Sequence, residues 1–338
     1  MNPVLLEGCS KGFQAYFDEK RTAGCNMQQD WMVGVVIPAR NEEAHIRKVL
    51  ETLPKTVDLA IVVDDGSADQ TKQIAEKTDI TAELVVLSTD GIGVGGAIET
   101  GHKNLAGRLR NPFVSVVMAG DGQMNPDDLE QLIAPIIAGD YDYVKGDRSI
   151  HVKGYNKMPL LRKFASAILS FFTTLAAGQR IKDPQCGFTA TSHKVLNQWN
   201  WSRSWNGYGY PNFWLIQLAH HGWKIGSVPV ESIYRRETSG IKPLKFFLRV
   251  GLMMAIEHHR RNISWVMSKN TSLYSIGAML AYVFGWITIA GGYSITMRAF
   301  WSFDLSSLFL VILLWSIAHI FDRMATVARQ KVNINATS

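Results

Sequence analysis

The segment VVMAGDGQMNPDDL, residues 116–129, carries the side chains of this chain that are best suited to holding a metal ion. Asp121 and Gln123 lie two positions apart, directly after an apolar run. Mg²⁺ prefers oxygen ligands and readily binds one or two carboxylates together with phosphate oxygens and water. Where a second carboxylate spaced by one residue could stand, the chain has Ala119. The loop could therefore be a metal site that has lost one ligand, a different kind of metal site, or an ordinary turn.

Three further polar clusters follow apolar runs in the same way: Asn41-Glu42, Asp64-Asp65 and Asp147-Arg148. Segments with helical periodicity lie between the runs, so the pattern predicts an α/β fold with a mostly parallel sheet and helices on both faces. Ligands of such sheets bind beyond the carboxyl ends of the strands. All four clusters should meet at that edge, although each alone would be ordinary loop chemistry. We expect the strands at 33–39, 59–65, 82–88, 112–120 and 141–147.

Two long apolar stretches follow the α/β region and predict a pair of membrane-spanning helices. Residues 272–297 carry no charged side chain, and residues 305–321 carry none apart from His319. A helix needs about 20 apolar residues to cross a bilayer. Basic residues flank the outer ends of the pair, and the positive-inside rule then places both ends and the large domain in the cytoplasm. A buried helical hairpin in a soluble core is the alternative.

Two amphipathic segments, 158–178 and 242–261, place apolar side chains on one face and basic side chains near their starts. Helices of this kind lie in the headgroup layer of a membrane, with their basic groups on phosphate. Core-packing helices are the alternative. Residues 1–30 have no long apolar core and predict an N-terminal arm without a secretory signal. The three cysteines show no metal-ligand spacing, which favours a reduced, cytosol-facing protein.

Six motifs along the chain have the order and spacing of a known family. They are VVIPARNEE, IVVDDGSADQT, GDGQMNPDDL, KGDRS, DPQCGF and VPVESIYRRETSGIK. Over about residues 31–245 the chain resembles the family 2 inverting glycosyltransferases with the GT-A fold. Within that family it is most similar to the polyprenyl-phosphate glycosyltransferases, which include dolichyl-phosphate mannose synthases and bactoprenol glucosyltransferases. The resemblance implies inverting transfer of a sugar from a nucleotide-sugar to a dolichyl or undecaprenyl phosphate, giving a polyprenyl-phosphate sugar for glycan assembly.

The resemblance also implies roles for residues that bind the nucleotide-sugar. Pro38, Arg40 and Glu42 match positions that line the nucleotide pocket, and Arg40 stands where the family often has tyrosine. Val62 and Asp64 match base-binding positions. A carboxylate that accepts a hydrogen bond from a base N–H gives selectivity through a charge-assisted contact.

The family's metal-binding positions are matched by Asp121 and Gln123, while Ala119 marks the loss of a third ligand position. The resemblance therefore implies Mg²⁺ or Mn²⁺ as the cofactor. Asp127 and Asp128 belong to the first turn of the following helix, where acidic side chains favour the helix dipole, and we do not expect them to be ligands.

Five more residues are implicated in the reaction. Arg148 matches an arginine near the donor phosphates, and Arg236 with Lys242 matches a basic pair on a loop near the active site. Arg162 is a candidate for the acceptor phosphate. A lipid phosphate is already ionised and needs no general base, whereas a sugar hydroxyl would need one. Asp183 is the residue we would suspect as that base, with a turn before Pro184 as the alternative.

The expected partners are a nucleotide-sugar donor, a polyprenyl phosphate acceptor and a lipid bilayer, with no nucleic acid and with homo-oligomers open. Alternatives are a membrane glycosyltransferase that uses a sugar or glycolipid hydroxyl, and a non-catalytic scaffold that binds nucleotide-sugars. A processive polysaccharide synthase would carry Gln-x-x-Arg-Trp, which HHRRNISW does not match. The expected division of the chain is an N-terminal arm at 1–30, a catalytic domain at 31–240, a juxtamembrane amphipathic helix at 241–268, and a transmembrane hairpin with a cytoplasmic tail at 269–338.

Overall fold

The computed structural model describes residues 31–149, 160–231, 233, 243–269, 271–298 and 305–337, with the backbone alone at 160–162, 243–244, 291–298, 305 and 331–337. Its sheet has seven strands in the order β3-β2-β1-β4-β6-β5-β7. β6 runs antiparallel to both neighbours and every other pair is parallel, which confirms a mostly parallel sheet. The strands are β1 Met32–Ala39, β2 Leu59–Asp64, β3 Glu83–Ser88, β4 Phe113–Val117, β5 Tyr143–Asp147, β6 Thr189–Ser192 and β7 Ile225–Pro229.

The central strands form because their residues suit a position covered on both faces. From Val33 onward every residue of β1 is buried, and so is every residue of β2. Both are runs rich in valine and isoleucine, which pack well on a pleated surface that is buried on both sides. The five strands predicted from the sequence correspond to β1 to β5. The sequence does not predict β6 and β7, because TATS is short and polar and IGSVP contains a glycine.

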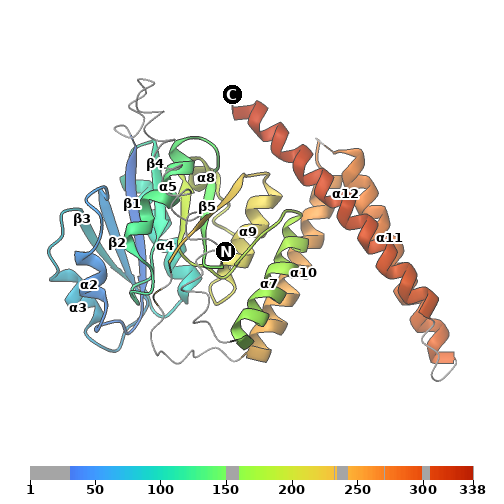
Figure 1. The fold of residues 1–338 in the computed structure, drawn as a ribbon, viewed down its shortest axis with the longest axis horizontal. Coiled ribbons are helices and arrows are strands. Elements are labelled where there is room, and N and C mark those ends of the chain that lie inside the picture. Colours follow the sequence, from blue (N-terminus) through green and yellow to red (C-terminus); the bar gives the residue numbers. More distant parts are fainter. Residues whose placement is uncertain are drawn as a thin grey trace, which may run out of the picture.

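Helices cover both faces of the sheet and produce two separate core clusters (Figure 1). On one face lie α2 Ile46–Glu51, α3 Thr71–Glu76 and α5 Leu129–Ile137. On the other lie α4 Val94–Arg108, α8 His193–Gln198 and α9 Tyr210–His220, with α7 Leu160–Ala177 and α10 Pro243–Val266 packed outside α9. In this arrangement, loops lie at the carboxyl ends of β1, β2 and β4.

The outer helices α7 and α10 lie side by side (Figure 1). Both expose apolar side chains. Neither is a fully buried core helix, which agrees with the amphipathic pattern of the sequence. On α7 the exposed aromatic residues are Phe164, Phe171 and Phe172. Along α10 and just past its end, exposed side chains recur at helical spacing: Leu248, Leu252, Ile256, Ile263 and Met267.

The last two helices, α11 Leu273–Arg298 and α12 Leu305–Thr337, pair with each other and extend away from the sheet (Figure 1). By length and composition both can cross a membrane. Only 28% and 22% of their apolar spans are buried, whereas a core helix of a soluble domain would be mostly buried. α12 also continues as one helix well beyond residue 321, where the apolar stretch ends. The segment expected to be a tail is therefore helical through Thr337.

Candidate active site

The carboxyl ends of the three central strands meet at one edge of the sheet. In the register of β1 and β2, Ala39 lies opposite Asp64. Past the strand ends, the Asp65 backbone N–H donates to the Ala39 carbonyl at 2.9 Å. On the other side of β1, the Gly120 N–H donates to the Pro38 carbonyl at 3.1 Å. The loops that begin at these points are therefore held against one another.

Asn41 joins the loop after β1 to the loop after β2. Its backbone has a positive φ of 57°, a conformation that asparagine tolerates better than most residues. Its Oδ1 accepts from the Ala68 N–H at 2.8 Å, and its own N–H donates to Ser67 Oγ at 2.9 Å. The Glu42 N–H in turn donates to Thr71 Oγ1 at 2.7 Å. These bonds fix the backbone that carries Arg40 and Glu42, ahead of α2.

Two residues predicted for the nucleotide pocket lie at this edge. Arg40 is exposed, and a Cβ built on Gly91 would lie 3.7 Å from its guanidinium nitrogen Nη1. Arg40 therefore extends along the loop after β3. Asp64 is buried, and its Oδ1 accepts no hydrogen bond from the described part of the chain. A buried carboxylate oxygen without a donor is unfavourable, so this atom suits a ligand N–H.

Pro38 and Val62 are strand residues that lie beneath the edge. Both are buried, and Val62 belongs to the core cluster on the α2 side of the sheet. The match of Val62 to a base-binding position stays a prediction; its side chain has no exposed surface, so a contact with a base would have to come from its backbone. Neighbouring residues along a strand point to opposite faces, and Val62 points to the face covered by α2, α3 and α5.

Asp65, the neighbour of Asp64, has a structural role that the sequence does not predict. Its Oδ1 accepts from Thr89 Oγ1 and from the Ile92 N–H, both at 2.7 Å, and its Oδ2 accepts from the Gly93 N–H at 2.8 Å. The side chain is buried. Asp65 thus fixes the loop between β3 and α4, including the glycine beside Arg40.

Replacing Asp65 by alanine should lower the stability of the fold. Three donors lose the buried carboxylate that accepts from them, and we expect a loss of about 3 kcal/mol, or roughly 10 °C in Tm. Thermal unfolding of the purified protein in detergent measures this. Asp90→Ala removes an exposed carboxylate from the same loop and should leave Tm unchanged. Equal Tm values for the two variants would show that the Asp65 bonds do not hold the loop.

The predicted metal loop follows β4 in a tight turn. Gly122 has a positive φ of 66°, and the Gln123 N–H donates to Asp121 Oδ1 at 3.0 Å. Asp121 and Gln123 are both partly exposed. Among the described residues, no group of three or more histidine, cysteine, aspartate or glutamate side chains could hold a metal ion. A carboxylate and an amide are hard oxygen donors, so they fit Mg²⁺ or Mn²⁺ when a phosphate and water supply the other ligands.

The chain beyond β7 returns to this loop. The Ile233 N–H donates to the Gln123 carbonyl at 3.0 Å, and the Glu231 N–H donates to Asp128 Oδ2 at 2.7 Å. Asp128 is buried and serves as an anchor for this segment. Arg236 and Lys242 follow in sequence but lie outside the described residues, as does the side chain of Arg162.

Arg148 and Asp183 form a salt bridge at the end of β5. The guanidinium donates from Nε and Nη2 to the two carboxylate oxygens, each at 2.7 Å, and the Arg148 N–H donates to Oδ2 at 3.0 Å. Asp183 is buried and holds a positive φ of 42°. Burial alone would raise the pKa of Asp183, but the bonds and charge of Arg148, together with nearby Lys145, hold it below its usual range. A carboxylate with a lowered pKa is a poor proton acceptor, so the pair favours a positioning role for Asp183.

Because of this ion pair, the stability of the folded protein should depend on pH. Because the folded-state pKa of Asp183 lies below its ordinary value of 3.8, its contribution is fully present above that value and is lost as the pH falls through the folded-state pKa. Asp183→Asn has no such titration. The Tm difference between the wild type and Asp183→Asn should therefore shrink as the pH falls below the ordinary value of 3.8. A constant difference over this range would contradict the assignment.

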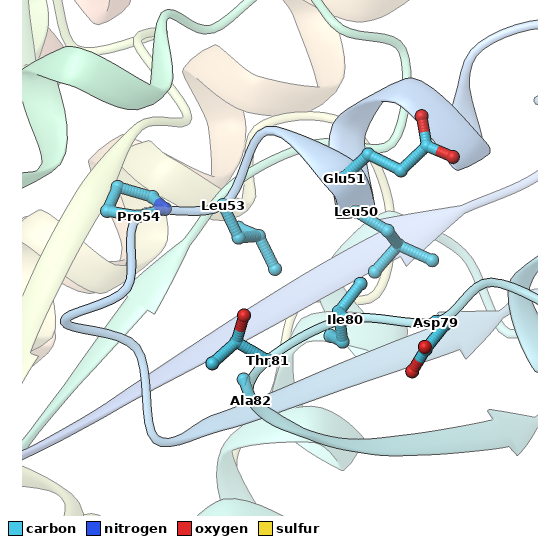
Figure 2. A pocket seen from close by; sticks show the side chains of 8 residues that line it. All are labelled: Leu50, Glu51, Leu53, Pro54, Asp79, Ile80, Thr81 and Ala82. Carbon is cyan, nitrogen blue, oxygen red and sulfur yellow. The ribbon is translucent and has the colours of Figure 1, made fainter.

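The hollow shown in Figure 2 belongs to the other end of the sheet. It lies between the end of α2 and the loop before β3, at the amino ends of the strands, and holds about 340 Å³. It brings none of the predicted site residues together. Its lining residues are Leu50, Glu51, Leu53, Pro54, Asp79, Ile80, Thr81 and Ala82.

Comparison with known proteins agrees with this fold. The family model described as Glycosyl transferase family 2 matches residues 34–199. The UDP-N-acetylglucosamine–dolichyl-phosphate N-acetylglucosaminyltransferase of Methanococcus voltae is 32% identical over 241 residues, which cover 65% of this chain and 95% of that protein. The dolichyl-phosphate beta-glucosyltransferase of Trichomonas vaginalis is 30% identical over 219 residues, covering 59% and 65%.

A solved structure shows the same fold. Glucosyl-3-phosphoglycerate synthase from Mycobacterium tuberculosis, in complex with Mn²⁺, UDP-glucose and phosphoglyceric acid, superposes with a TM-score of 0.51 at 21% identity. The match covers 69% of this chain and 81% of that one. The sheet described above is therefore a GT-A sheet, and the chain belongs to glycosyl transferase family 2.

Proposed function

We propose that this glycosyltransferase moves a sugar, with inversion, from a nucleotide-sugar to a polyprenyl phosphate at the cytoplasmic face of a membrane. The observation that carries the proposal is that Asp64, Asp121 and the Arg148–Asp183 pair all lie at the carboxyl edge of the sheet. The dolichyl-phosphate transferase from Methanococcus voltae, which aligns over 95% of its length, supports the acceptor class.

Each residue at the edge has a definite task in this reaction. Asp64 Oδ1, which has no described donor, accepts a hydrogen bond from the donor base, and exposed Arg40 extends along the neighbouring loop after β3. Asp121 and Gln123 would hold Mg²⁺ or Mn²⁺, which supplies positive charge to the leaving diphosphate when bound. Arg148 presents its charge in a geometry already fixed by Asp183, so little reorganisation is needed as the leaving group gains charge.

The bond changes follow from an ionised acceptor. An acceptor phosphate oxygen forms the new bond to the anomeric carbon from the face opposite the diphosphate. The bond from that carbon to the nucleotide oxygen breaks, and its electron pair leaves with the nucleotide diphosphate. No proton has to be removed from the acceptor. This agrees with Asp183, whose two oxygens are engaged by Arg148 and whose pKa is lowered.

The exposed apolar surfaces support a membrane-borne acceptor. The exposed stripe of α10, the aromatic residues of α7 and the hairpin of α11 and α12 together would place one side of the molecule in lipid. Basic residues at the outer ends of the hairpin favour the cytoplasmic side for the catalytic domain.

Nucleotide release tests the proposal. The purified full-length protein is incubated with Mg²⁺ or Mn²⁺, a polyprenyl phosphate and a panel of UDP- and GDP-sugars. We expect one donor to release nucleotide only when the lipid phosphate is present, and chelation of the metal to stop the release. Absence of release with every donor would refute the enzyme assignment.

A further inference from the structure

A buried ion pair joins the C-terminal hairpin to the catalytic domain. Arg261 on α10 donates from Nη2 to Asp322 Oδ2 on α12 at 2.6 Å, and neither residue has any exposed surface. Arg261 Nη1 also donates to Thr326 Oγ1 at 3.3 Å, one turn further along α12. The guanidinium lies over the ring of Trp265 at 4.6 Å from its centroid. Asp322 directly follows the apolar stretch of α12, so the pair marks the place where this stretch ends.

The end of α7 also contacts the ion pair. Gly178 follows α7 with a positive φ of 68°, and a Cβ there would lie 3.0 Å from Arg261 Nη1 and 3.1 Å from Asp322 Oδ2. Its backbone therefore touches the pair without space for a side chain. Three helices from separate parts of the sequence thus meet at one point, and we call Gly178, Arg261, Asp322 and Thr326 the junction.

Further specific hydrogen bonds surround the junction. On one side Trp286 Nε1 of α11 donates to His259 Nε2 at 3.0 Å. On the other side Arg329 Nη1 donates to Ser268 Oγ at 3.1 Å and Gln330 Nε2 donates to Gln179 Oε1 at 3.0 Å. Directional bonds on both sides fix an angle between helices better than apolar contact does. A hairpin that served only as a tether would need none of them.

The physics of buried ion pairs indicates what such a junction contributes. The desolvation of two charges offsets much of their attraction, so a buried pair adds little net stability. It does penalise every arrangement in which one charge stays buried without the other, and thereby selects one geometry. The Arg261–Asp322 pair therefore contributes mainly by fixing the orientation of α12 relative to α10.

We infer that the junction holds the apolar hairpin at one angle to the sheet, so that the carboxyl edge faces acceptor phosphates at the membrane surface. This inference rests on the proposed transfer to a membrane-borne acceptor. Gly178, Arg261, Asp322 and Thr326 are positioning residues in this account, because they touch neither donor nor acceptor. Disturbing the junction should impair catalysis on an acceptor in a bilayer and spare catalysis on one in solution.

Gly178→Ala tests this with a matched control. Gly139 also follows a helix with a positive φ, of 79°, but a Cβ there would meet nothing within 4 Å. Both alanine variants carry the same backbone strain, and only Gly178→Ala crowds the ion pair. With a long-chain polyprenyl phosphate in vesicles, we expect kcat/KM to fall about tenfold in Gly178→Ala and to stay near wild type in Gly139→Ala. With a short, water-soluble prenyl phosphate, both should match the wild type.

Asp322→Asn provides a second variant if Gly178→Ala does not fold. It keeps the shape of the side chain and removes the charge that holds Arg261, and it should show the same selective loss. Equal loss on both acceptors would mean that the junction is merely structural, and no loss on either would mean that it does not position the domain. Either result overturns the inference.

A measurement without turnover separates this inference from the proposed function. A fluorescent label at Phe171→Cys, on the exposed face of α7, reports depth in vesicles through quenching by spin-labelled lipids. Cys9 and Cys25 are changed to serine for this purpose, and Cys186 is buried. We expect one depth in the wild type and a changed depth in Gly178→Ala. An unchanged depth would overturn the inference, whether or not the wild type transfers sugar.

Discussion

Asp121→Asn is expected to lower kcat for metal-dependent sugar transfer by about a thousandfold while leaving Tm unchanged. The carboxylate is one of only two protein ligands that the loop after β4 offers, so its charge has no substitute. The substitution is isosteric, and its side chain can still accept from the Gln123 N–H, which keeps the turn. Nucleotide release at saturating donor, measured across a series of Mn²⁺ concentrations, checks this.

Asp127→Asn is the matched control for this experiment. Asp127 lies six positions further along the same segment. It is exposed and belongs to the short 3-10 helix Pro126–Asp128. It should keep wild-type kcat. Wild-type turnover in Asp121→Asn, or a comparable loss in Asp127→Asn, would show that the metal loop has been misplaced.

Separating Arg148 from Asp183 should produce the second large effect. We expect Asp183→Asn and Arg148→Lys each to reduce kcat/KM about a hundredfold. Asparagine cannot offer two charged acceptors to the guanidinium, and lysine lacks the planar fork that matches a carboxylate. Because the two residues act as a unit, the double variant should be little worse than either single variant. Steady-state kinetics on all three variants gives the comparison.

An exposed neighbour supplies the control, since Lys182→Gln changes a charge beside Asp183 without touching the pair. It should retain wild-type kcat/KM. If Asp183 acts as a general base, Arg148→Lys should be far more active than Asp183→Asn, and the two losses should multiply in the double variant. That outcome would contradict a positioning role.

The sheet and its functional edge follow from the sequence because their signals are local. Runs such as VGVVIPA and LAIVVDD read as buried strands without knowledge of their neighbours. The parallel arrangement then places the residues after each strand at one edge. The short polar strand β6 has no such signal, and its place depends on pairing with β4 and β5.

Which role each residue at the carboxyl edge has depends on three-dimensional contacts. Asp64 and Asp65 are identical in type and adjacent, yet among the described hydrogen bonds the loop before α4 donates to the side chain of Asp65 and to the backbone carbonyl of Asp64. Arg148 and Asp183 are 35 residues apart in sequence, and Arg261 and Asp322 are 61 apart. Periodicity cannot pair residues over such distances, since loop geometry and helix packing decide the pairs. The helical continuation of α12 past the apolar stretch has the same origin, because Asp322 and Thr326 contact α10.

Following a labelled sugar into lipid tests the central claim most directly. The full-length protein in vesicles is given Mg²⁺, a polyprenyl phosphate and a sugar-labelled nucleotide donor identified by nucleotide release. We expect a labelled product that extracts into organic solvent, releases its sugar in mild acid, and has the anomeric configuration opposite to that of the donor. Nucleotide release with the label in water alone, or with the label attached to a hydroxyl, would contradict it.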